Sequence, residues 1–319
     1  MLATRFTDLV GCQVPVQLAG MSRVGTSALA AAVTNAGGLG MLPGASPSEL
    51  RPELSALAGT AAGPFGVNFL IPFLDDEAIE LATAQARLVE FFYGEPDASL
   101  VERVHRAGAL AGWQTGSAEE ARRAAGVGCD VVVAQGVEAG GHVRGRLPLL
   151  VVLDEVLDAV DVPVLAAGGI GTGRMVAAVL AAGADGVRVG TRFVAATESG
   201  AHPEYVRALV AAGSEDTVLT ETFGVDWPDA PHRVLKSAVA ALSRQEEELV
   251  AVRQDGDREV PLWRGDSTPP SRSVRGAVAA TALYAGQSVG AVTRVEPAAA
   301  IVAELVEEAV SLLTGRPRG

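Results

Sequence analysis

Eight short apolar runs, each followed by a helix-like stretch, constrain the fold of this 319-residue chain more than any other feature. The runs are continuous and do not alternate with polar residues, which is typical of parallel strands buried on both faces. The predicted strands are Val14–Leu18, Gly38–Leu42, Phe65–Leu70, Leu88–Phe92, Leu110–Trp113, Val131–Ala134, Val164–Ala167 and Gly186–Val189. The predicted helices are Thr26–Ala36, Pro47–Leu57, Asp76–Ala86, Ser99–Ala107, Ala118–Ala125, Leu149–Val160 and Gly173–Ala182. This α/β pattern favours a (β/α)₈ TIM barrel over an open doubly wound sheet. An open sheet would need a central change in strand order, and the sequence alone does not exclude one.

The pattern changes after Arg192, and this change suggests three regions. We expect residues 1–199 to form the barrel with the cofactor and active site. Residues 200–278 show no strand alternation, so we expect a small, mainly helical insert. Residues 279–319 return to an Ala/Val-rich helix, Pro297–Leu313, which we expect to complete the barrel.

Charge and composition exclude several classes of function. The chain carries 25 Lys+Arg against 38 Asp+Glu, a net charge of −13, so we expect no nucleic-acid partner. No uninterrupted apolar stretch of about 18 residues predicts a membrane span, and the first residues lack the apolar core of a secretion signal. Cys12 and Cys129 form no disulfide or zinc pattern, and we expect two buried thiols in a cytoplasmic protein.

The loop after the sixth predicted strand combines glycines with a histidine. It reads Gln135-Gly136-Val137-Glu138-Ala139-Gly140-Gly141-His142. Glycines let backbone N–H groups approach a ligand closely, and reactive groups of such barrels lie in these loops. His142 is therefore the candidate catalytic residue, and a hydrogen-bonded structural histidine is the alternative.

The next two strands end in further glycines. Gly168 and Gly169 precede a helix that begins at Gly173, and Gly190-Thr191 follow the eighth strand. Exposed N–H groups and a helix N-terminus bind anions without lysine, and barrels commonly place a phosphate after strands seven and eight. We therefore predict a phosphate site here; tight helix–strand packing would explain the same glycines.

Other strand ends add polar groups, and several known motifs are missing. Asn68 lies in an apolar run, where a buried amide needs partners. Met21 follows a run of small residues that would accommodate a flat ring, and Gln114 is a further candidate. The sequence has no His-Glu-x-x-His pair and no Cys cluster, so we expect no metal. It also has no Walker loop, no dinucleotide fingerprint and no Gly-x-Ser-x-Gly elbow of a serine hydrolase.

These motifs together resemble the nitronate monooxygenase family, formerly called 2-nitropropane dioxygenases, whose members bind FMN in a (β/α)₈ barrel. The Gln-Gly-x-Glu-Ala-Gly-Gly-His string is the most specific piece. The other matching pieces are Leu18–Met21, Asn35–Gly40, Gly66–Asn68, Ala166–Ile170, Gly190–Phe193 and Ala285–Ser288. The resemblance thus extends over nearly the whole chain.

The resemblance implies a set of FMN contacts and a role for His142. The implied cofactor contacts are Met21, Asn68, Gln135, Gly140, Gly168, Gly169, Arg188, Val189, Gly190 and Thr191. Relatives often carry Gln where Arg188 stands, so its cation would either pair with the phosphate or point away. His142 matches the histidine that takes a substrate proton or hydrogen-bonds the nitro group. Phe92-Tyr93 replaces a frequent His-Phe pair, which concerns the substrate pocket.

The expected function is FMN-dependent oxidation of alkyl nitronates, and of nitroalkanes as a further substrate, by O₂ to carbonyl compounds and nitrite. The alternative is an FMN-dependent NAD(P)H reductase of the enoyl-acyl carrier protein or quinone type. A flavin-binding barrel without turnover is a third hypothesis. Nucleotide-processing barrels of the inosine-phosphate dehydrogenase type need a loop cysteine, and both cysteines here precede strands. The expected partners are a small nitronate and O₂, and a homodimer is compatible with the sequence.

Overall fold

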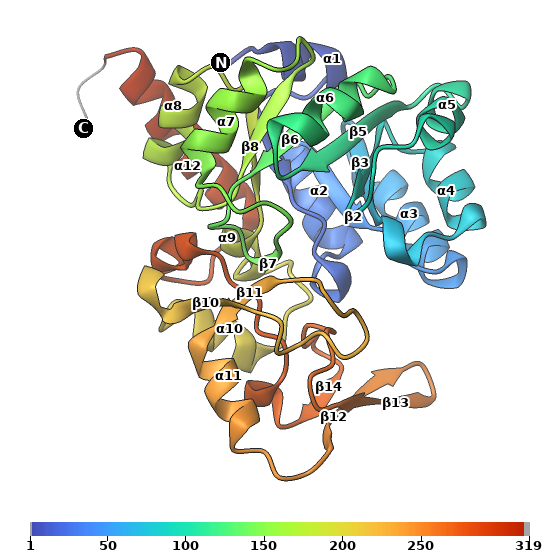
Figure 1. The fold of residues 1–319 in the computed structure, drawn as a ribbon, viewed down its shortest axis with the longest axis vertical. Helices are drawn as coiled ribbons and strands as arrows, with labels where there is room; N and C mark the ends of the chain where they lie inside the picture. Colours follow the sequence, from blue (N-terminus) through green and yellow to red (C-terminus); the bar gives the residue numbers. More distant parts are fainter. Residues whose placement is uncertain (1, 316–319) are drawn as a thin grey trace.

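The computed structural model describes residues 2–315 and shows a barrel of parallel strands above a smaller part (Figure 1). The barrel strands are β1 (Val16–Leu18), β2 (Gly40–Pro43), β3 (Phe65–Leu70), β4 (Leu88–Phe92), β5 (Leu110–Thr115), β6 (Val131–Gln135), β8 (Val164–Ala167) and β9 (Gly186–Val189). Their order is β1-β9-β8-β6-β5-β4-β3-β2, and every neighbouring pair is parallel. A parallel bridge from Gln17 to Leu39 joins the first and last strands of this order. The predicted (β/α)₈ barrel is therefore confirmed.

Helices surround the strands, as the sequence predicts. After α1 (Arg5–Val10), they are α2 (Ser27–Asn35), α3 (Pro47–Thr60), α4 (Asp76–Thr83), α5 (Ala98–Arg106), α6 (Ala118–Gly126), α7 (Leu149–Leu157), α8 (Gly173–Ala181) and α12 (Ala298–Leu313). The predicted start of α6 is seen in the hydroxyl of Ser117, which accepts a hydrogen bond from the Glu120 N–H at 3.3 Å. The C-terminal helix α12 packs against α8 and α2 and so occupies the place after β9.

Small residues let the layers approach closely. The barrel strands are buried over almost their whole length, and one continuous apolar core joins them to the helices. Gly40 shows the requirement most clearly, because a Cβ there would overlap the carbonyl oxygen of Ala30 on α2. The high content of glycine and alanine therefore serves helix–sheet packing as well as the loops.

The insert differs from the prediction. Its described elements are α10 (Pro203–Val210), β10 (Thr217–Thr220), β11 (His232–Leu235), α11 (Lys236–Ser243), β12 (Leu249–Asp255), β13 (Arg258–Trp263) and β14 (Val274–Gly276). The prediction of a mainly helical insert is wrong, because strands outnumber helices in this described segment. The overlooked signal is Gly256-Asp257, the two-residue turn between β12 and β13, in which Gly256 has φ +58°. A Gly-Asp pair between two β-prone runs indicates a hairpin.

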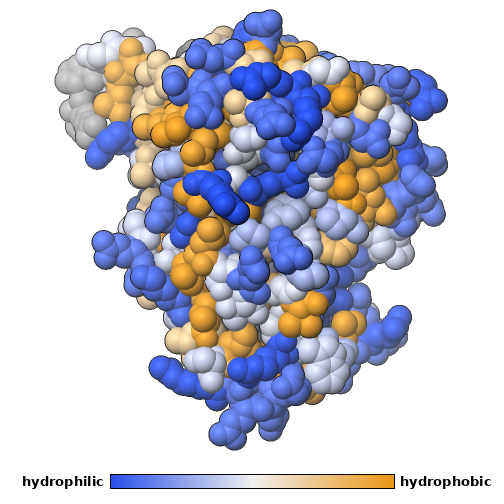
Figure 2. All heavy atoms as spheres, viewed as in Figure 1, coloured by the Kyte–Doolittle hydropathy of each residue, from blue (hydrophilic) through white to orange (hydrophobic). Residues whose placement is uncertain are grey.

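The insert is attached at the carboxyl ends of the barrel strands. The short strand β7 (Gly141–His142) follows β6 and pairs antiparallel with β11, in the sheet order β10-β11-β7. The insert has its own apolar core, which includes Tyr205 and Phe223. On the face drawn in Figure 2, hydrophilic side chains cover most of both parts, and hydrophobic ones form separate small groups. The β7–β11 pairing places insert residues directly over the predicted site.

Candidate active site

A cavity opens at the carboxyl-terminal face of the barrel, between the strand ends and the insert. Its volume is about 190 Å³, and it is partly open to solvent. Residues near the carboxyl ends of β3, β4 and β5, and residues at or after the carboxyl ends of β1, β6, β8 and β9, line it. Tyr205, Pro269 and Tyr284 of the insert side complete the wall. This is the face on which such barrels carry their chemistry.

The predicted site residues gather here with one exception. His142 and the predicted cofactor contacts Met21, Asn68, Gln135, Gly140, Gly168, Gly169, Arg188, Gly190 and Thr191 all line the cavity. Val189 does not, because its side chain is packed in the barrel core. Its carbonyl oxygen accepts a hydrogen bond from the Ala19 N–H at 2.9 Å, so Val189 helps to join the ends of β9 and β1.

Glycines form a cradle along one side of the cavity. Gly168 and Gly169 both have positive φ, +102° and +71°, which L side chains rarely adopt. At Gly140 a Cβ would collide with the backbone of Gly286. The hydroxyl of Thr191 accepts the Gly286 N–H at 3.0 Å and holds the same segment. Consecutive N–H groups in this conformation suit an anion such as a phosphate.

The floor of the cavity is a buried polar network inside the barrel. Arg188 donates through Nη1 to the carboxylate of Glu90 and to Gln114 Oε1, the latter at 2.6 Å. Asn68 Nδ2 donates to Glu90 Oε1 at 3.0 Å, and Gln17 Nε2 donates to Glu90 Oε2 at 3.2 Å. Arg188 therefore points into the barrel and is neutralised there by Glu90. The guanidinium is therefore paired with a carboxylate of the protein itself.

The floor retains polar atoms that can bind a ligand. Within residues 2–315, Arg188 Nε and Nη2, Gln114 Nε2 and Asn68 Oδ1 form no hydrogen bond, and all three residues line the cavity. They offer donors and an acceptor on one surface. A flat heterocycle with carbonyl and imide groups needs such a set, and the glycine cradle beside it suits a phosphate. The residues present therefore fit a flavin mononucleotide.

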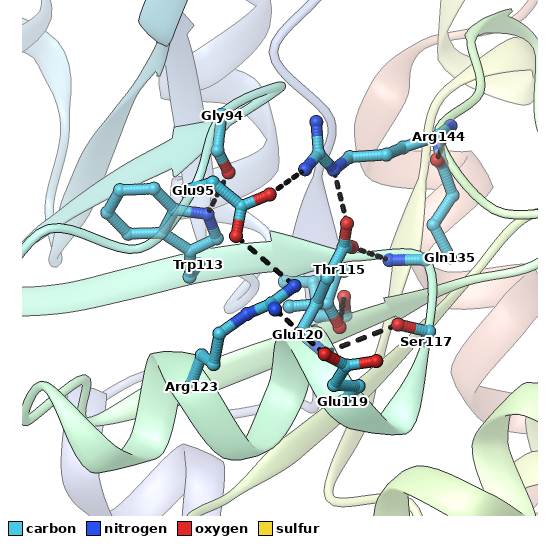
Figure 3. Close-up of polar contacts among 12 residues, drawn as sticks. Gly94, Glu95, Trp113, Thr115, Ser117, Glu119, Glu120, Arg123, Gln135 and Arg144 are labelled. Atoms are coloured by element: carbon cyan, nitrogen blue, oxygen red, sulfur yellow. Dashed lines mark hydrogen bonds and ion pairs between the residues drawn. The ribbon is translucent and has the colours of Figure 1, made fainter.

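Gln135 holds the histidine loop. Its Nε2 donates to the His142 carbonyl at 3.0 Å, and its Oε1 accepts the Arg144 N–H at 3.3 Å. Arg144 in turn pairs with Glu120 of α6 at 2.5 Å and with Glu95, after β4, at 2.7 Å (Figure 3). Arg123 reaches the same Glu95 at 3.2 Å. This network of side chains fixes the main chain from the His142 carbonyl to Arg144.

The imidazole of His142 has no hydrogen-bond partner. Neither ring nitrogen bonds any residue in the described part of the chain, and Nε2 is fully buried. Burial, with a smaller effect from His232, lowers the pKa of His142 from 6.5 to about 3. His142 is therefore a neutral imidazole at physiological pH. A buried unpaired nitrogen is unfavourable by about 1–3 kcal/mol, which points to a bound ligand as its partner.

His232 shows what a structural histidine looks like in the same place. Its Nε2 accepts the Phe223 N–H at 3.1 Å, and its Nδ1 lies 2.9 Å from the Ala230 carbonyl. Because a backbone N–H can only donate, Nδ1 carries the proton. Both nitrogens of His232 are thus engaged by backbone, and the contrast identifies His142 as the histidine available to a substrate.

The neutral state of His142 predicts a loss of stability in acid. Its pKa is lower in the folded protein, so the unfolded chain binds more protons between about pH 6.5 and pH 3. The free energy of unfolding therefore decreases as the pH is lowered. At about pH 5, His142 accounts for a decrease of about 2 kcal/mol relative to neutral pH. We expect His142→Gln to lose this part of the pH dependence in urea unfolding. Parallel stability curves for both proteins would contradict the buried neutral state.

Comparison with known proteins places this barrel among the flavin-dependent oxidoreductases. The nitronate monooxygenase family matches residues 3–82 and 76–308, and the chain therefore belongs to that family. In the part that the structure describes, no cluster of His, Cys, Asp and Glu could hold a metal ion. No helix within residues 2–315 is long and apolar enough to cross a membrane.

Three proteins similar to this chain differ in the activity for which they are named. Nitroalkane oxidase from Streptomyces ansochromogenes is 30% identical with a TM-score of 0.79, covering 98% of this chain and 99% of that one. FabK from Thermotoga maritima is 30% identical with a TM-score of 0.80, covering 99% and 98%. The (3aS,4S,5R,7aS)-5-hydroxy-7a-methyl-1-oxo-octahydro-1H-indene-4-carboxyl-CoA dehydrogenase of Mycobacterium tuberculosis is 38% identical over 74% of this chain. That match spans 67% of the dehydrogenase, about two thirds of its length.

Four residues of the site escaped prediction. Glu90 stands inside an apparently apolar strand and binds Arg188 of the floor. Tyr205 and Tyr284 line the cavity, Trp227 stacks on His142, and all three come from segments in which we predicted no site residue. A charge within a buried strand was a usable signal for Glu90. The aromatic residues reach the site only through the fold of the insert. Among the residues without an assigned role, Ser288 lines the cavity, and Tyr93 contacts the His142 ring. The backbone N–H of Gln287 donates a hydrogen bond to the Glu138 carbonyl at 2.9 Å.

Proposed function

We propose that this protein is an FMN-dependent nitronate monooxygenase that oxidises alkyl nitronates with O₂ to carbonyl compounds and nitrite. The observation that carries the proposal is the unpaired, buried, neutral imidazole of His142 beside the cavity that the glycine cradle and the polar floor line. FMN, when bound, would supply the electron transfer between nitronate and O₂. The chain's own residues supply binding, orientation and hydrogen bonding.

Each part of the cavity has a task in this reaction. The N–H groups at Gly168 and Gly169 would hold the phosphate, and the Arg188–Gln114–Asn68 floor would hold the flat ring. A nitronate is already an anion, so it needs a hydrogen-bond donor and not a base. A neutral imidazole provides one N–H donor, whereas a pKa of about 3 makes it a weak base at neutral pH. The site therefore favours nitronates over neutral nitroalkanes.

An NAD(P)H-dependent reductase of the enoyl-acyl carrier protein or quinone type is the second candidate. The 38% identity to a CoA-thioester dehydrogenase favours it. Both candidates use the same flavin cradle, and they differ in the electron donor. The choice thus depends on which donor reaches the flavin.

The test is the absorption of the purified, FMN-loaded protein mixed without oxygen with each donor in turn. We expect an alkyl nitronate to bleach the flavin rapidly, and NADH and NADPH to leave it oxidised on the same timescale. Readmission of O₂ should then release nitrite and a carbonyl compound. Rapid bleaching by NADPH, with none by the nitronate, would replace the proposal by the reductase. A protein that does not bind added FMN would refute both candidate functions.

The cytoplasmic location and the homodimer stay predictions.

A further inference from the structure

Trp227 reaches the active site from the insert and covers one face of the His142 ring. The two ring centroids lie 4.0 Å apart with an interplanar angle of 29°. Trp227 is itself 7% exposed, and it makes T-shaped contacts with Tyr93 at 4.7 Å and with Phe73 at 5.0 Å between ring centroids. It is thus a fixed surface and not a mobile side chain.

Nothing else in the described chain fixes the plane of the His142 imidazole so closely. The main chain of His142 is held by β11 and by Gln135, but the ring makes no hydrogen bond. Its other ring contacts are longer: His232 at 5.2 Å, Tyr284 at 5.6 Å and Tyr93 at 5.8 Å between centroids. A histidine usually takes its orientation from the hydrogen bond on its second nitrogen. Here stacking has to replace that bond.

We propose that Trp227 is a positioning residue for His142, which sets the plane of the imidazole and excludes water from one of its faces. The catalytic part of this inference rests on the proposed function. The effect on the ring itself does not, because it is a property of the protein without substrate. The insert therefore contributes to the reactivity of a residue that the barrel carries.

The groups around His142 indicate how its ionisation should respond. His232 faces it from β11, Tyr93 from the loop after β4, and Tyr284 from the segment before α12. Arg144 lies over the Tyr93 ring at 5.9 Å, and Asp226 and Glu221 act on His232. Burial is the larger cause of the low pKa of His142, ahead of the charge on His232. Uncovering the ring should therefore raise its pKa toward 6.5.

The experiment follows the His142 ring by NMR in histidine-labelled protein from about pH 8 to pH 5. In the wild-type protein we expect the resonance to keep its neutral position throughout. In Trp227→Leu, which removes the ring plane, we expect a titration with a midpoint above about pH 5. Trp227→Phe retains a stacking ring and should behave as the wild type. Trp263→Leu is the matched control, because Trp263 is 53% exposed on β13, and it should change nothing.

A neutral His142 in a folded Trp227→Leu protein would overturn the proposal, and so would equal titration in the Leu and Phe variants. If the Leu variant does not fold, Trp227→Met decides in the same way, because it fills the space without a ring plane. For turnover we expect Trp227→Leu to lower kcat for a nitronate by about tenfold or more with the FMN Kd retained. Failure of the proposed function would instead appear as no nitronate oxidation by the wild type, whatever the NMR result.

Discussion

His142→Asn should lower nitronate oxidation by about 10²–10³-fold while FMN remains bound. The wild-type imidazole is neutral, buried and unpaired, so it can donate a hydrogen bond to a nitronate oxygen as charge moves during the reaction. Asparagine is smaller and cannot stack on Trp227 in the same way, so its amide is not held at the same position. Removing one preorganised donor has an effect of this size in other enzymes. Steady-state oxygen consumption with a nitronate gives the measurement.

Two controls separate the role of His142 from a general loss of structure. His105→Asn alters a histidine on α5 that pairs with Asp130 at 2.7 Å, outside the cavity, and should leave turnover unchanged. FMN affinity of His142→Asn should stay close to that of the wild type, because the cradle glycines and the floor do not involve its ring. Unchanged nitronate turnover in His142→Asn would remove His142 from the mechanism.

Much of the barrel could be predicted because each strand and helix carries a local signal. The bounds of β3, β4, β8 and β9 agree with the sequence prediction, since buried parallel strands are continuous apolar runs. The glycine loops were also readable, because the residues that make them sit beside each other in the chain. Residues 135–142 and 168–173 need no long-range information to be recognised as loops at strand ends.

The missed residues depend on contacts between distant segments. Trp227 contacts His142 only because β11 pairs with β7. No local sequence pattern predicts a strand of two residues such as β7. Gln135 was predicted to touch the cofactor, yet both polar atoms of its amide are used on the loop after it. Which neighbour satisfies a buried polar atom is decided by the packed structure, so residue type alone could not assign the role of Gln135.

Glu90 and Arg188 show the same limit with charges. They lie 98 residues apart, and each is at most 5% exposed. Glu90 also accepts hydrogen bonds from Asn68 and Gln17, but Arg188 is its only cationic partner among the described residues. Removing one member of such a pair leaves the other charge buried without compensation. The pair therefore predicts a large and non-additive effect of substitution.

Arg188→Gln should destabilise the FMN-free protein by about 3–5 kcal/mol in urea unfolding. Glu90→Gln should be destabilising for the same reason, because it leaves the guanidinium buried. The double variant replaces both charges by amides. We expect its loss of unfolding free energy to be smaller than the sum of the two single losses by more than about 1 kcal/mol. Arg51→Gln breaks an ion pair with Glu77 in which both side chains are 62% exposed, and should cost less than about 1 kcal/mol. Additive single effects, or an Arg188→Gln protein as stable as Arg51→Gln, would show that Glu90 does not depend on Arg188 and that the floor of the cavity is held by its amides alone.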